Sequence, residues 1–282
     1  MLALRHAVCL CAITTLGCAT ERLAPEVVTS AWAKQSLEKS ADVVIAIDVA
    51  AIHRDPFFSK LVEVTFADAA QPYDAIWTAS HIDVFATIAK TFTAVAYGVG
   101  PLPPALAQCF DAQLRDERIT VSASSGKWIA SNVATRGDVG APVETDGHAL
   151  FEAWMGPGAM DEALLRARWD TAEMWRHLHA LRFRVEGGAT PGVILDARFE
   201  TSVDAEHALN DFARAERMLE RNMSEVHDEE LAKHLRDTIA NVHVARSGVD
   251  LRVDLHITTA FTQYLSRMLD QERRPSSRRD GC

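Results

Sequence analysis

Residues 118–134 read RITVSASSGKWIASNVA and carry the clearest structural signal in the sequence. Apolar and polar residues alternate on both sides of Ser125-Gly126. This two-residue period is typical of strands with one buried face. A Ser-Gly pair between two such runs is typical of a tight hairpin turn. The stretch therefore predicts two antiparallel strands joined at Ser125-Gly126.

A second stretch of the same kind lies in the other half of the chain. Residues 242–258 read VHVARSGVDLRVDLHIT and predict a hairpin that turns at Ser247-Gly248. In both halves a strand pair and a helical stretch precede the Ser-Gly hairpin. The upstream spacings keep no constant offset, so the pattern suggests two similar subdomains without requiring a duplication.

The rest of the chain alternates between strand-like and helix-like stretches. Strands are predicted at Val43–Val49 and within residues 82–89, 92–100, 148–155, 181–187 and 192–201. Helices are predicted at Pro56–Phe66, Pro103–Asp116, Met160–His179, Asp204–Met223 and Glu225–Ala240, with a last helix carrying Phe261, Leu265 and Leu269. This order predicts an α+β fold with mixed or antiparallel sheets and helices packed on one face.

The Gly156-Pro157-Gly158 break is the best candidate for a boundary between subdomains. The predicted organisation has five segments: a signal peptide at 1–17, a lipidated cysteine and tether at 18–40, α+β subdomains at 41–157 and 158–270, and a disordered tail at 271–282.

Charge and composition limit the function. The 282 residues include 39 acidic and 29 basic side chains, a formal net charge of −10. An acidic surface repels a phosphate backbone, so nucleic acid is not expected as a partner. No run of 18 or more apolar residues is present, so no permanent transmembrane helix is expected.

The first 20 residues have the layout of a secretory signal. Arg5 and His6 precede an apolar run, Ala7–Leu16, which is followed by Gly17 and Cys18. A positive start, a short apolar segment and a small residue before the cut define such signals.

The sequence Thr15-Leu16-Gly17-Cys18 resembles the lipobox of bacterial lipoprotein precursors, in which Gly or Ala precedes the cysteine. The resemblance covers this segment alone, and Thr15 and Leu16 depart from the usual Leu and small residue. It implies that the Cys18 thiol receives a diacylglycerol, that the chain is cut after Gly17, and that acyl chains such as palmitate hold the protein in the membrane. Ala19 after the cysteine suggests sorting to the outer membrane, facing the periplasm.

Other interpretations of the segment are an ordinary signal peptide with a coincidental cysteine, a cytosolic N-terminal helix and a metal site at Cys9 and Cys11. Two thiolates without further ligands do not complete a tetrahedral site, so the metal site is the weakest of these. Cys109 and Cys282 remain as thiols after cleavage. They could pair in an oxidising compartment, although Cys109 is better explained as a buried apolar residue on a helix.

Motifs for chemistry are scarce. The sequence contains no G-x-S-x-G, H-E-x-x-H, P-loop or C-x-x-C pattern. The strongest metal candidate is His227, Glu230 and His234, which would share one face of a helix and could hold zinc with a water. A solvated polar face is the more common origin of such a pattern, so no metal and no cofactor are predicted.

Four further groups of residues are candidates for a site. Asp48, His53 and Asp55 follow the first strand and could line a cleft, although strand-end loops are commonly polar. The remaining candidates are better explained structurally: His177 and His179 point apart on a helix, Ser125-Gly126-Lys127 form a turn, and Trp169 and Trp175 belong to a helix core.

The sequence therefore predicts an envelope lipoprotein whose folded part binds or scaffolds without catalysis, anchored to the membrane through Cys18. A tethered metal-assisted hydrolase using His227, Glu230 and His234 is one alternative. A small-molecule binder with a cleft between the two halves is the other.

Overall fold

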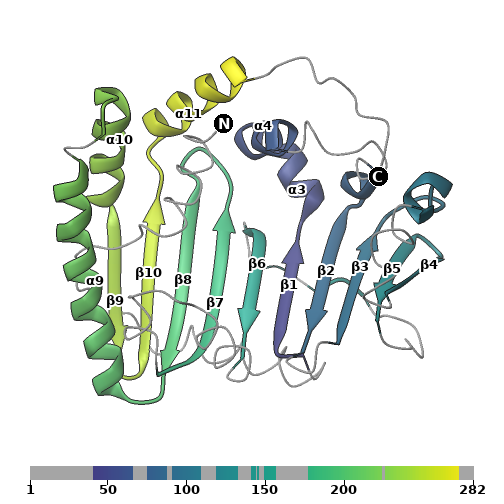
Figure 1. Ribbon diagram of the computed structural model, residues 1–282, viewed down its shortest axis with the longest axis horizontal. Coiled ribbons are helices and arrows are strands. Elements are labelled where there is room, and N and C mark those ends of the chain that lie inside the picture. Colours follow the sequence, from purple (N-terminus) through teal and green to yellow (C-terminus); the bar gives the residue numbers. More distant parts are fainter. Residues whose placement is uncertain are drawn as a thin grey trace. The chain divides into compact units, whose positions relative to one another are not determined.

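The structure is a computed structural model of the chain (Figure 1). It describes residues 41–65, 75–87, 91–108, 119–132, 141–143, 145, 149–156, 177–223 and 226–272. These residues group into two compact units. Unit 1 contains the described residues within 155–185 and 189–262, and unit 2 contains those within 41–154, 186–188 and 263–272.

Unit 2 contains an antiparallel sheet with strand order β4-β5-β3-β2-β1-β6. The strands are β1 (Val43–Ile47), β2 (His81–Ala86), β3 (Phe92–Tyr97), β4 (Thr120–Ser124), β5 (Lys127–Ser131) and β6 (Ala149–Met155). The predicted hairpin at residues 118–134 is confirmed as β4 and β5, with Ser124 opposite Lys127. Gly126 has a φ of 75°, which glycine adopts without the steric cost that a Cβ brings.

Short helices follow β1 in unit 2: α3 (Val49–Arg54), α4 (Pro56–Thr65) and the single turn η1 (Ala75–Thr78). The sequence predicted that the first strand continues to Val49, and this is wrong because the Asp48 side chain accepts a hydrogen bond from the Ala51 N–H and begins α3. The next helix was predicted correctly to within one residue at its end.

Unit 1 contains a second antiparallel arrangement, with strand order β7-β8-β10-β9. Its elements are β7 (Leu178–Glu186), β8 (Gly192–Phe199), α9 (Ser202–Asn222), α10 (Glu229–Ile239), β9 (Val242–Ser247) and β10 (Asp250–His256). Helix α11 (Thr259–Glu272) begins in unit 1, and its residues from Gln263 onward group with unit 2. Antiparallel strands with helices confirm the predicted α+β class.

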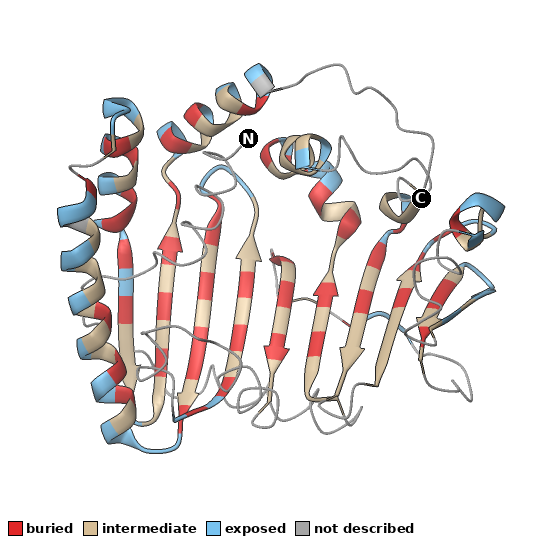
Figure 2. Cartoon of the chain, in the orientation of Figure 1, coloured by how far each residue is buried: buried red, intermediate tan, exposed pale blue. Residues whose placement is uncertain are grey.

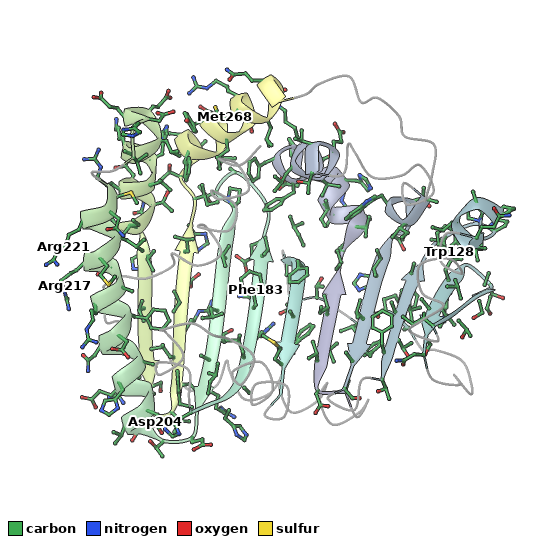
Figure 3. All side chains as sticks on the ribbon, in the orientation of Figure 1. Trp128, Phe183, Asp204, Arg217, Arg221 and Met268 are labelled. Carbon is green, nitrogen blue, oxygen red and sulfur yellow. The ribbon has the colours of Figure 1, made fainter. Side chains whose placement is uncertain are left out.

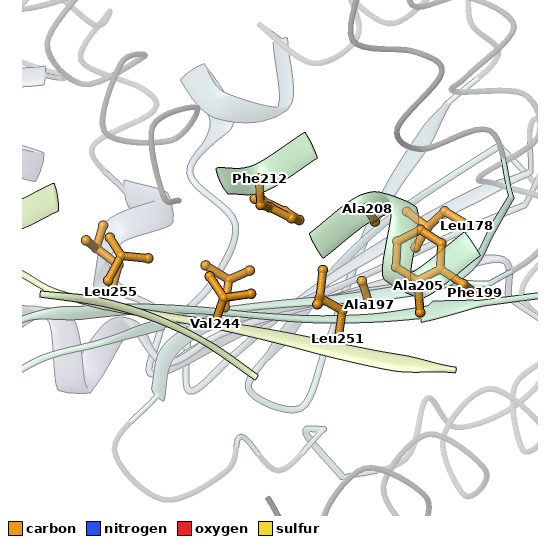
Figure 4. Packing of buried hydrophobic residues seen from close by; sticks show 11 residues of the cluster. Leu178, Ala197, Phe199, Ala205, Ala208, Phe212, Val244, Leu251 and Leu255 are labelled. Carbon is orange, nitrogen blue, oxygen red and sulfur yellow. The ribbon is translucent and has the colours of Figure 1, made fainter. Parts of the chain in front are cut away.

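Helix α9 covers one face of β8, β9 and β10. Its buried side chains, Ala205, Ala208 and Phe212, lie over an apolar layer supplied by alternate strand positions (Figure 4). That layer includes Ala197, Val244, Leu251, Val253 and Leu255. On the opposite side of α9, Arg217 and Arg221 extend away from the strands (Figure 3). The helix is therefore amphipathic, as its predicted apolar stripe required.

The hairpin predicted at residues 242–258 is confirmed as β9 and β10, but its turn lies one residue later than predicted. Ser247 pairs with Asp250, so Gly248 and Val249 are the two central residues. Gly248 has a φ of 61°. Glycine is thus the first central residue in this turn and the second in the β4–β5 turn.

Several predicted helices differ from the structure or lie partly outside the described residues. The helix predicted to end at His179 is wrong at that end, because β7 already begins at Leu178. The helix predicted from Glu225 begins instead at Glu229, where the Asp228 side chain caps it. Helix α11 continues to Glu272, two residues into the segment predicted as a disordered tail. Most of the predicted helix Pro103–Asp116 lies outside the described residues, because 109–118 are not described. Residues 157–176 and 273–282 also lie outside the described residues.

We predict that Phe212→Ala will lower the free energy of unfolding of unit 1 by about 3–5 kcal/mol, because it leaves a cavity between α9 and the strands. Phe212 is 2% exposed. Met218→Ala is a matched control on the same helix, since Met218 is 57% exposed and its loss is expected to change stability by about 0.5 kcal/mol at most. Urea unfolding of both variants measures the difference, and equal losses would contradict this packing.

Candidate functional site

The candidate polar residues after β1 all have hydrogen-bond partners in the structure. Asp48 caps α3 through a 2.7 Å hydrogen bond from the Ala51 N–H. The His53 imidazole Nε2 lies 2.8 Å from the Trp77 carbonyl oxygen, and the pair is exposed. Asp48 therefore caps a helix and His53 makes a surface contact, and a cleft lined by these residues and Asp55 stays a prediction.

Asp55 is the most constrained of these residues. Its Oδ1 accepts hydrogen bonds from the N–H groups of Phe57 and Phe58, both at 3.0 Å, at the start of α4. Its Oδ2 accepts a 2.7 Å hydrogen bond from the N–H of Gly188. A Cβ on Gly187 would lie 2.7 Å from the same Oδ2, so glycine is needed for this approach. Asp55 thus ties a glycine loop to the start of α4.

The proposed metal-binding face is not formed. His227 lies before the N-cap of α10 and is exposed, so it does not share a helical face with Glu230 and His234. His234 is 9% exposed and its ring stacks on Phe261, with centroids 5.3 Å apart. Its Nε2 lies 3.8 Å from Glu230 Oε1. Within the described residues, no group of three or more His, Cys, Asp or Glu side chains is arranged to hold a metal ion.

The other sequence candidates have structural roles or lie elsewhere. Leu178 and His179 belong to β7, so the expected helical separation of His177 and His179 does not apply; both histidines are exposed. Ser125 and Gly126 form the β4–β5 turn as predicted. Cys18, Cys109, Trp169, Trp175 and Cys282 all lie outside the described residues.

Unit 2 contains a buried His–Asp pair that the sequence did not single out. His81 Nε2 lies 2.9 Å from Oδ1 of Asp83, whose side chain is fully buried. The other carboxylate oxygen of Asp83 accepts a 2.9 Å hydrogen bond from the Val143 N–H. The His81 ring also packs edge-on against Tyr97, which is the residue opposite it on β3. Asp83 therefore fixes both the imidazole and the backbone at Val143, as a structural anchor.

The strongest candidate site is a set of charged side chains on β7, β8 and β10 of unit 1, which we call the charged face. Its members are Arg182, Arg184, Asp196, Arg252 and Asp254. Arg182, Arg184 and Asp196 are 4%, 8% and 5% exposed. Buried arginine and aspartate side chains are rare unless they are paired or functional. Figure 2 shows the alternation of buried and less buried positions along β8 and β10.

The charged face follows from strand register. Leu251, Val253 and Leu255 belong to the core cluster that includes α9, so the residues between them lie on the other side of the sheet. Arg252 pairs with Asp196 across β8 and β10. One row along, Arg198 pairs with Asp250, with the positions of the acid and the base exchanged between the strands.

Arg252 links the two acids of the charged face. Its Nη1 lies 3.8 Å from Asp196 Oδ1, and its Nε donates to Asp254 Oδ2 at 3.3 Å. Asp254 Oδ1 in turn lies 3.4 Å from Nε2 of His256. A Cβ on Gly192 would lie 2.8 Å from the His256 ring, so the glycine opposite His256 makes room for the imidazole.

Burial is the main cause of the raised pKa of Asp196. Arg252, Arg182 and Arg184 act in the opposite direction and lower it, whereas the negative charge of Asp254 raises it further. The pKa of Arg198 is also raised, chiefly by its hydrogen bonds to Asp250. The charged face can hold charge and bind or release a proton.

The sequence did not reveal the charged face, although a signal was present. Arg182 and Arg184 alternate with apolar residues in the stretch LRFRVEG, as Arg252 and Asp254 do in LRVDLH. Alternation identifies a strand with two different faces, but it does not say whether the polar face meets water.

No protein-family model matches this chain, and no curated protein is significantly similar to it in sequence. Two solved structures, crystal forms I and III of TP0453, resemble it at 10% and 11% sequence identity. Form I aligns over 81% of this chain and 94% of TP0453, with a TM-score of 0.35. Form III aligns over 80% and 94%, with a TM-score of 0.40. Scores this low do not assign a shared function.

The described part of the chain contains no helix that combines the length and apolar character needed to cross a membrane.

We predict that Asp55→Ala will destabilise the protein by about 2 kcal/mol or more, because it leaves three backbone N–H groups without their acceptor. Asp48→Ala is the matched control: it removes a single capping bond and is expected to cost about 1 kcal/mol. Urea unfolding compares the two variants. A loss for Asp55→Ala no larger than that for Asp48→Ala would show that the loop contact contributes nothing.

Proposed function

We propose that this chain is an envelope lipoprotein, anchored in the outer membrane through Cys18 and facing the periplasm, whose folded units bind or scaffold without catalysis. The observation that carries the proposal is the segment Ala7–Cys18, an apolar run that ends in Gly17-Cys18. A positive start before the run completes the pattern of an export signal.

The chemistry of a cysteine suits this role, because a thiolate is the strongest nucleophile among the side chains at neutral pH. Attack of Cys18 Sγ on the glyceryl carbon that carries the headgroup of a diacylglycerol phospholipid forms a carbon–sulfur bond and breaks the bond from that carbon to the phosphate oxygen. The phosphate headgroup leaves, and the thiol proton is lost. Cleavage after Gly17 then leaves the lipidated cysteine as the first residue. Each buried methylene contributes about 0.8 kcal/mol to membrane binding, so two or three acyl chains give a stable anchor.

The distance between the anchor and the folded units is compatible with attachment at a membrane surface. Residues 19–40 separate Cys18 from the first described residue, Ala41. At about 3.5 Å per residue, a chain of this length reaches about 75 Å at most. The units can therefore meet partners well away from the lipid headgroups.

The described side chains favour binding or scaffolding over catalysis. Asp48 and Asp55 cap helices, Asp83 holds a backbone N–H and an imidazole, and Arg198 holds Asp250. Side chains that hold neighbouring groups by such hydrogen bonds stabilise the fold, and a stable fold suits a protein that binds or scaffolds.

We predict that wild-type protein made in cells fed labelled palmitate will carry the label, and that Cys18→Ser will abolish it, because the anchor requires the sulfur atom. Cys11→Ser is the control, since that residue lies in the same apolar run but is removed with the signal. Autoradiography of the purified protein, with detergent partitioning, measures the anchor.

Each outcome distinguishes one interpretation. Label on the Cys18→Ser variant would place the lipid elsewhere and reject the anchor. An unlabelled periplasmic wild type would indicate an ordinary signal peptide. An unlabelled protein that retains Met1 in the cytosol would reject export altogether.

A further inference from the structure

Two neighbouring rows across β8 and β10 contain the same pair of residue types in very different geometries. In one row, Arg198 Nε and Nη2 donate to Asp250 Oδ1 and Oδ2 at 2.7 and 3.1 Å. In the other row, Arg252 Nη1 and Asp196 Oδ1 are 3.8 Å apart, which is beyond hydrogen-bonding distance. The first pair is a bidentate ion pair, and the second is an ion pair without a hydrogen bond.

Asp196 is also the more deeply buried of the two acids. Its side chain is 6% exposed, whereas that of Asp250 is 20% exposed. Asp196 Oδ1 is buried and accepts no hydrogen bond from the described residues. An ionised carboxylate without water or a donor is costly to bury, and a protonated carboxyl group is much less so.

The charges around Asp196 compensate only in part for this burial. The guanidinium charges of Arg182 and Arg184, on β7, and of Arg252, on β10, lower the pKa of Asp196. Asp254, also on β10, repels the ionised form and takes the Nε hydrogen bond of Arg252. His256 lies beyond Asp254, with its Nε2 3.4 Å from the Asp254 carboxylate. Arg252 thus interacts with two acids, Asp196 and Asp254, whereas Arg198 pairs with Asp250.

We propose that the Asp196 carboxyl group is a proton-dependent switch in unit 1: the neutral acid stabilises the pairing of β8 with β10, and ionisation weakens it. The proton comes from solvent and returns to it, so no other reactant is needed. The proposal does not depend on the Cys18 anchor.

The direction of the effect follows from the raised pKa of Asp196. A carboxyl group whose pKa is higher in the folded protein stabilises the fold fully below its unfolded pKa of 3.8. That contribution is lost as the pH rises through the folded value. Between the two values, one proton is taken up on folding, so the unfolding constant rises by up to about tenfold per pH unit from this group.

The test is amide hydrogen exchange of the full-length protein across pH 4–7.5, with protection corrected for intrinsic rates. We compare the wild type with Asp196→Asn and follow peptides that contain β8 or β10. The ratio of protection factors, variant over wild type, is expected to increase as the pH rises, by up to about tenfold per pH unit, because asparagine cannot ionise. Asp250→Asn is the control and should lower protection at pH 7, because it breaks the bidentate pair.

A ratio that is independent of pH would overturn the proposal, as would lower protection of Asp196→Asn than of the wild type at pH 7. If Asp196→Asn does not fold, the wild type still decides the matter. Carbon-13 NMR of labelled aspartate carboxyl groups gives the midpoint for Asp196. A midpoint above 3.8 supports the switch, and one at or below 3.8, the ordinary value, overturns it.

Discussion

In unit 1, the apolar side chains at alternate positions of β8, β9 and β10 are buried under α9, and this burial sets the direction of every other side chain on these strands. Because the period of a strand is two residues, Leu251 and Val253 can lie under α9 only if Arg252 lies on the opposite side of the sheet. The charged face is therefore a geometric consequence of the apolar core. Its chemistry is determined by which polar residue occupies each remaining position.

The two Arg–Asp rows show how strongly such chemistry depends on neighbours. Arg198 and Asp250 form a closed pair, and their hydrogen bonds raise the pKa of Arg198. Three arginines lower the pKa of Asp196, yet burial outweighs them and raises it. Arg252, the arginine paired with Asp196 across the strands, also donates a hydrogen bond to Asp254. Desolvation of a buried charge is repaid only by well-aligned partners. Counting only the opposite charges around Asp196 would therefore predict a lowered pKa, whereas its pKa is raised.

The sequence predicted the α+β class, the hairpins and most helices, because turns and amphipathic stripes are local signals. It failed where one side chain decides a boundary: Asp48 and Asp228 cap helices at positions where apolar periodicity gives no warning. The sequence located the candidate functional residues less well than the helices and strands. His227 was expected on a helix that begins two residues later, and Asp55 was considered for a cleft although it binds Gly188, 133 residues away in sequence. Contacts between distant segments, and the burial of Arg182 and Asp196, are tertiary properties that alternation alone does not encode.

Charged side chains at alternate strand positions also bear on the register between β8 and β10. If all the charged residues at alternate positions of β8 and β10 were apolar, both faces of these strands would be apolar, and a one-residue slip would still place apolar side chains under α9. With charges at alternate positions, the same slip would place Arg252 and Asp196 against Phe212, in the apolar core. Buried ionic groups are weak contributors to stability, and in some proteins they specify a single arrangement. The proton-dependent behaviour proposed for Asp196 would then arise from a residue that also keeps β8 and β10 in register.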